Sequence, residues 1–148
     1  MTEVVLPSSL IHVGSSAFQY CWALETVNIP ALVSTSDFTA QSMFADCPSL
    51  KNVTFSKDIT WLPKYLFDNC TSLESIALPA EVKSLTSADT SFDASGLKEV
   101  DLGGLTAIPA NMFKNGAALT TIDLSKVTEI GAYACQNCAA LTNIDLSM

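Results

Sequence analysis

The segment Cys135–Cys138, which reads Cys-Gln-Asn-Cys, is the part of the sequence that most directly suggests chemistry. Two cysteines separated by two residues are typical of a redox-active dithiol or of one half of a zinc site. A tetrahedral zinc site needs two further ligands, but the chain has no second Cys-x-x-Cys pair, and His12 is far away in the sequence. The five cysteines are odd in number, so at least one thiol is unpaired within a monomer. We therefore predict no metal site at these cysteines.

His12 is the only imidazole that could serve acid–base catalysis. It stands in the segment Ser-Leu-Ile-His-Val-Gly, where no nucleophile lies beside it and few acidic residues are near. The chain also lacks a glycine-rich phosphate-binding loop. We predict that His12 is a surface or partly buried residue, that the protein is not an enzyme, and that it takes no cofactor.

Composition and charge argue against several other functions. The chain has 148 residues, of which 49% are hydrophobic and 15% are charged, as expected for one globular domain. It has no arginine, and its 7 lysines are scattered singly among acidic residues that bring the net charge to −8. Nucleic acid and anionic membrane surfaces are therefore not expected partners. No apolar run approaches the roughly 18 residues that a membrane span needs, and no signal peptide is visible.

A repeated pattern organises the whole chain. The motif Leu-x-x-(Val/Ile)-x-apolar recurs in one phase, with starts 22 to 26 residues apart. We number its leucine as position 1. The seven segments start at Met1, Leu24, Leu50, Leu73, Leu97, Leu119 and Leu141. Repeats of this length are typical of solenoid proteins, in which stacked units share one core.

Two further columns recur in step with the motif. An aromatic residue stands five or six positions before each later leucine in most units, and a small residue stands two or three positions before it. The aromatic column is Phe18, Phe44, Phe67, Phe92 and Phe113, and the small column is Cys21, Cys47, Cys70, Ser95, Gly116 and Cys138. Cys135 occupies an aromatic position. We therefore expect the thiols to be buried, reduced and slow to react, and to fill space in the core.

The spacing within one unit predicts its local structure. Positions 4 and 6 are apolar and alternate with polar or small residues, which is the period of a strand with one buried face. The segments around Phe18, Phe44 and Phe67 suit a short helical turn at best. We predict an α/β solenoid, curved, with a concave parallel sheet of about seven short strands and helical or irregular convex segments.

These motifs resemble the BspA-like type of leucine-rich repeat, most closely at residues 13–30 and 62–79. The resemblance covers residues 1–148, and we interpret them as a single leucine-rich repeat domain of six repeat periods, a segment of a longer array. It implies a secreted or cell-surface bacterial protein. Such proteins act as adhesins or interaction modules, and several bind host matrix proteins. The resemblance implies no catalytic residues and no cofactor.

Positions 3 and 5 of the motif should point outward on the concave sheet. This interpretation places six candidate partner-binding residues there: Asn28, Thr54, Glu99, Asp101, Asp123 and Asp145. The three aspartates would form a ladder of like charges on neighbouring strands. Three readings stay open: a solvated surface, a contact for a cationic patch of a partner, or a calcium site.

Position 2 alternates in charge through Glu25, Lys51, Glu74 and Lys98, so we expect pairs between neighbouring strands that support the register.

We predict a non-catalytic protein-interaction or adhesion module that binds a protein, such as a host or extracellular matrix protein, through the concave sheet, at the cell surface or outside the cell. The alternative is a structural spacer within a larger surface protein. The apolar end strands also suggest self-association.

Overall fold

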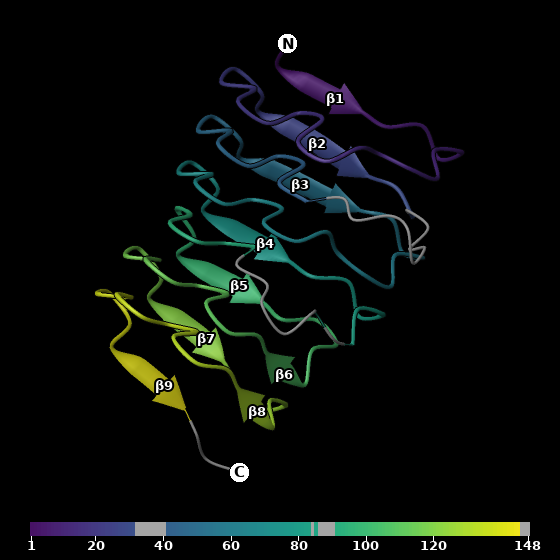
Figure 1. The fold of residues 1–148 in the computed structure, drawn as a ribbon. Helices are drawn as coiled ribbons and strands as arrows, with labels where there is room; N and C mark the ends of the chain where they lie inside the picture. The colour runs from purple at the N-terminus through teal and green to yellow at the C-terminus, as the bar shows by residue number, and fades with distance from the viewer. Residues whose placement is uncertain (32–40, 84, 86–90, 146–148) are drawn as a thin grey trace.

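The computed structural model describes residues 1–31, 41–83, 85 and 91–145, and the side chains of 143–145 lie outside that description. The chain winds into a stack of repeat units whose strands form one row (Figure 1). The row contains β1 (Glu3–Val5), β2 (Thr26–Ile29), β3 (Asn52–Phe55), β4 (Ser75–Ala77), β5 (Glu99–Asp101), β7 (Thr121–Asp123) and β9 (Asn143–Asp145). A second, shorter pair beside the last units contains β6 (Ala107–Ile108) and β8 (Glu129–Ile130).

The strand pairings are parallel and follow the repeat columns. β2 and β3 pair with Val27 opposite Val53, and β4 and β5 pair with Ile76 opposite Val100. The hydrogen-bonded sets are β1-β2-β3, β4-β5, β7-β9 and β6-β8. The prediction of a solenoid with about seven short parallel strands is confirmed, and β6 and β8 were not anticipated.

The convex segments are turns, so the helical part of the prediction was wrong. No helix occurs within the residues that the structure describes. Two residues with positive φ flank Phe18, Phe44, Phe67 and Phe113 instead, for example Ser42 (φ 55°) and Asp46 (φ 57°) around Phe44. Isolated left-handed residues interrupt a right-handed helix, since an L-residue that adopts positive φ cannot continue it.

Backbone hydrogen bonds join successive units along this turn side. The amide of Phe44 donates to the carbonyl of Leu66 (3.1 Å), and the amide of Asp46 donates to the carbonyl of Asp68 (2.8 Å). The same two bonds recur in each unit from Phe18 to Phe113. The turns therefore form a hydrogen-bonded ladder of their own, opposite the strand row.

The predicted aromatic column is the centre of the core. Successive rings stack at centroid distances of 5.3 to 6.2 Å and with interplanar angles of at most 26°. Four of its members are buried: Phe44, Phe67, Phe92 and Phe113. Because each ring contacts the ring before and after it, the column links units that are far apart in sequence.

We predict that Phe67→Ala will lower the free energy of unfolding by about 3–5 kcal/mol, because it removes a ring stacked between Phe44 and Phe92. Urea denaturation would measure the loss. Trp22→Ala serves as the control, since Trp22 is 70% exposed and should cost little. Equal losses for the two variants would contradict the assignment of the aromatic column as the core.

Candidate interaction surface

The concave face presents one row of exposed side chains on each strand. Val100 is buried between exposed Glu99 and Asp101, and the same alternation occurs on β4 and β7. Five of the six predicted residues are exposed on this face: Asn28, Thr54, Glu99, Asp101 and Asp123. The backbone of the sixth, Asp145, pairs in register with Asp123. Its side chain lies outside the described residues.

The N-terminal half of this face is a polar network. Thr54 Oγ1 donates to Asn28 Oδ1 (3.0 Å), so these two predicted residues are partners of each other. Asn52 Nδ2 donates to Thr26 Oγ1 (3.4 Å) on the same pair of strands. These bonds tie β2 to β3 through side chains as well as backbone.

The acidic end of the face also has a local structural role. Asp101 Oδ1 accepts a hydrogen bond from the amide of Gly103 (2.9 Å), and Asp123 Oδ1 accepts one from the amide of Ser125 (2.9 Å). Each carboxylate therefore closes an Asx turn where its strand ends. Gly103 has a φ of +58°, which is the left-handed conformation that glycine adopts readily. Sequence reasoning assigned these aspartates only to a charged surface and missed the turn.

An open hollow crosses the concave face. Its volume is about 740 Å³, and its walls come from β3, β4, β5 and β7, including Glu99, Asp101 and Asp123. A smaller hollow of about 330 Å³ lies at the strand ends between Asp101 and Lys126. The face can therefore receive a broad contact that meets carboxylates at one end.

The alternating charges at position 2 form two of the three expected pairs. Lys51 Nζ lies 3.8 Å from Glu25 Oε2, and Lys98 Nζ lies 2.8 Å from Glu74 Oε1. No ion pair is found between Lys51 and Glu74 in the described structure, because β3 and β4 are not paired.

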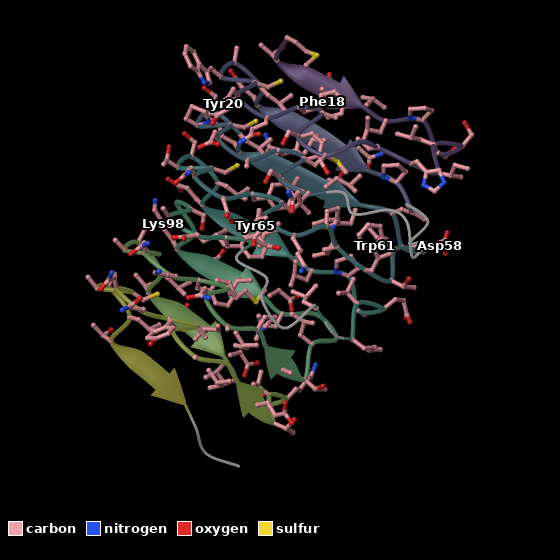
Figure 2. The ribbon with its side chains drawn as sticks, in the orientation of Figure 1. Phe18, Tyr20, Asp58, Trp61, Tyr65 and Lys98 are labelled. Carbon is pink, nitrogen blue, oxygen red and sulfur yellow. The ribbon has the colours of Figure 1, made fainter. Side chains whose placement is uncertain are left out.

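Figure 2 shows Lys98 and Tyr20 on the side of the molecule where the strands begin, and Asp58 and Trp61 on the side where the strands end.

The cysteine column bonds successive units together. Cys47 Sγ donates to the carbonyl of Phe18 (3.2 Å), and Cys70 Sγ donates to the carbonyl of Phe44 (3.2 Å). Cys138 Sγ makes the equivalent bond to Phe113 (3.1 Å). The thiols therefore act as hydrogen-bond donors as well as small core residues.

All five thiols are free, but their burial differs. Cys47 and Cys70 are buried as predicted, whereas Cys21, Cys135 and Cys138 are only half-buried. The expectation of full burial is wrong for these three, which lie in the segment between β1 and β2 and the segment between β8 and β9, at the two ends of the row. In the Cys-Gln-Asn-Cys segment the two thiols also contact each other.

Burial sets the acidity of these thiols. It raises the pKa of Cys47 to about 11 and that of Cys138 to about 11, and it moves the pKa of Cys70 and Cys135 upward. Reactive cysteines have a lowered pKa, so none of these four has the character of a nucleophile.

We predict slow labelling of Cys47 and Cys70 by a thiol reagent in the folded protein. At pH 8, a pKa of about 11 in place of 9.0 lowers the thiolate fraction of Cys47 about a hundredfold. Mass spectrometry after timed labelling would resolve each site. The urea-unfolded chain is the control, in which all five thiols should react alike. Rapid labelling of Cys47 in the folded state would contradict the burial.

The histidine and the possible metal ligands are the other candidate chemical groups. His12 is exposed in the first unit. Across the described residues no group of three His, Cys, Asp or Glu side chains is arranged to hold a metal ion. A search of the same residues finds no helix of the length and hydropathy that crossing a membrane requires.

A polar ladder on the turn side was missed by sequence reasoning. Asp46 accepts hydrogen bonds from Gln19 Nε2 (3.0 Å) and Asn69 Nδ2 (2.9 Å). Asn137 Nδ2 donates to Asn115 Oδ1 (2.8 Å) in the last units. The signal was present, since an Asn or Asp directly precedes the small residue in four units: Asp46, Asn69, Asn115 and Asn137. All four have positive φ, which Asn and Asp tolerate.

The sequence model of the family described as "BspA type Leucine rich repeat region" matches six copies in this chain, over residues 1–102 and 38–148. No curated protein matches the chain.

Solved structures of bacterial leucine-rich repeat proteins share the fold. A leucine-rich repeat protein from Eubacterium ventriosum superposes with a TM-score of 0.74 and 22% identity, over 100% of this chain and 45% of that one. A leucine-rich cell surface protein from Faecalibacterium prausnitzii gives 0.64 and 24%, over 99% and 36%. The T. pallidum leucine-rich repeat protein gives 0.66 and 21%, over 96% and 78%. The chain thus spans less than half the length of the first two proteins.

Proposed function

The chain belongs to the BspA-type leucine-rich repeat family, and we propose that it is a non-catalytic module that binds a protein partner through its concave sheet face. The repeat domain is a general scaffold for protein interaction. The observation that carries the finer proposal is the exposed row along β3, β4, β5 and β7, with its hollow of about 740 Å³. That hollow is bounded by carboxylates at one end, so the preferred partner surface is cationic.

We place the module at the cell surface and give it an adhesive role. The support is that the family resemblance implies surface proteins and that the Faecalibacterium prausnitzii structure is described as a cell surface protein. The partner class on this proposal is a host or extracellular matrix protein. Glu99, Asp101, Asp123 and Asp145 form the charged end of the contact.

The spacer function is the alternative. The turn-side ladder from Phe18 to Phe113 is continuous and needs no partner, so it could hold a rigid array that presents another domain. Under this alternative the concave carboxylates affect only solubility and turn geometry.

We predict that the double variant Asp101→Asn with Asp123→Asn will weaken partner binding by about 2- to 30-fold and make it less sensitive to salt. Asparagine removes the charge but keeps the side-chain oxygen that accepts from Gly103 and Ser125, so the turns should persist. Surface plasmon resonance against purified fibronectin, laminin and collagen at two salt concentrations would measure the change.

The matched control is Asp58→Asn with Glu129→Gln, which removes the same charge from exposed residues away from the concave row. Equal binding by both double variants would contradict the role of the carboxylates. A wild-type chain that binds none of the matrix proteins would contradict matrix adhesion and favour the spacer.

Self-association through the end strands is a further proposal. In the described residues β1 pairs only with β2, and Val5 at the end of β1 is 68% exposed. A second copy could pair with this edge. Sedimentation velocity over a range of concentrations should show a dimer at high concentration, whereas a monomer throughout would refute the idea.

A further inference from the structure

The concave sheet is interrupted between β3 and β4. The ladder of paired residues also stops between β5 and β7. There, however, the amide of Thr120 still donates to the carbonyl of Lys98 (3.0 Å), as the amide of Lys51 does to the carbonyl of Glu25 (3.0 Å) in the N-terminal half. Among the described residues no backbone hydrogen bond joins β3 to β4. We call the boundary between residues 51–57 and 74–81 the β3–β4 seam.

The two strands turn backbone groups toward this seam. The amides of Asn52 and Ser56 donate to β2, and the amide of Leu78 donates to β5. Alternate residues of a strand direct their backbone groups to opposite edges. The N–H and C=O groups of two residues on each strand therefore face the seam: Val53 and Phe55 on β3, and Ser75 and Ala77 on β4.

Three hollows follow one another along the seam. One of about 380 Å³ lies between Lys51 and Glu74, where the strands begin. The hollow of about 740 Å³ continues past Val53 and Ile76, and a third of about 530 Å³ extends beyond Phe55. All three border the seam, so a groove follows it, and the middle hollow also widens across β5 and β7.

The floor of the groove is apolar and partly uncovered. Val53 and Phe55 are half-buried, whereas Val27 and Ile76 at equivalent inward positions are buried. Phe55 is the only aromatic residue at position 6. Its ring packs edge-on against Phe67 at 6.4 Å, so this unit places an extra aromatic between strand and core. The bulk of Phe55 gives a physical reason for the two strands to separate here.

We propose that the β3–β4 seam binds an extended peptide segment of a partner protein, about five or six residues long and alternating between apolar and basic residues. This proposal rests on the proposed interaction function and locates a peptide site within it. The segment forms backbone hydrogen bonds with the seam edges, as in β-strand addition. Its apolar side chains cover Val53 and Phe55.

The basic positions follow from the neighbouring strand. Ser75 lies opposite Glu99, and Ala77 lies opposite Asp101. Because Ser75 and Ala77 are small, a lysine or arginine on the outward face of the bound segment reaches over them to the two carboxylates.

Hydrogen exchange measured by NMR tests the open seam in the free protein. The amides of Val53, Phe55, Ser75 and Ala77 should exchange faster than those of Asn52, Ser56 and Leu78 on the same strands, which are hydrogen-bonded. Uniform protection along β3 and β4 would mean that the seam is closed, and would overturn the proposal.

Binding of a labelled peptide, Lys-Val-Lys-Val-Lys-Val, tests the occupant by fluorescence anisotropy. Ala77→Pro removes one seam-facing N–H and should weaken binding about tenfold, whereas Ala77→Ser keeps the N–H and a small side chain and should change binding little. A peptide with proline in place of the central valine keeps the charge and should also bind about tenfold more weakly to the wild-type protein. This control does not depend on the folding of a variant.

Equal affinity for the two peptides, or for the Pro and Ser variants, would place the basic peptide on the acidic face instead and overturn the seam site. No binding of the peptide would overturn it too. In either case, matrix-protein binding that responds to Asp101 and Asp123 would leave the proposed function standing, so the two failures are distinguishable.

Discussion

The hydrogen bonds that join successive turns are the constraint on which the rest of the structure depends. In each unit two amides, such as those of Phe44 and Asp46, donate to carbonyls of the following unit. They can do so because left-handed residues on both sides of the aromatic hold the turn open. The ring is thereby fixed between equivalent rings at 5.3 to 6.2 Å, and the column of phenylalanines follows.

Because of this ladder, the side of the molecule that holds the units together is not the side that we propose to bind a partner. The turn-side ladder continues across the unit boundary where the sheet is interrupted, since Phe44 bonds to Leu66 and Cys70 Sγ bonds to Phe44. The strands are therefore not the only link between units, and the concave face is free to vary. Its side chains are polar in one half and acidic in the other, and the hollow extends from β3 over the acidic half.

The sequence predicted the parts of the fold that depend on periodicity. Leucines at position 1 and phenylalanines in step with them identified the strands, the core and the outward row. The prediction of helical turns around Phe18, Phe44 and Phe67 was wrong because the spacing of apolar residues does not indicate the backbone angle φ. The Asn and Asp residues beside the cysteines carried that information, since these two residues tolerate left-handed backbone. The interruption between β3 and β4 was not predicted, although Phe55 stands out at position 6, because the sequence does not show how its ring packs against Phe67.

The most direct test of this account is residue-resolved hydrogen exchange along the turn side. The amides of Phe44, Asp46, Phe67 and Asn69 all donate to the next unit. If the ladder holds the stack together, these amides should be among the slowest in the protein and should exchange only when the whole domain unfolds. Exchange as fast as that of the amides of an exposed loop would show that the turns do not hold the units together, and would contradict the account.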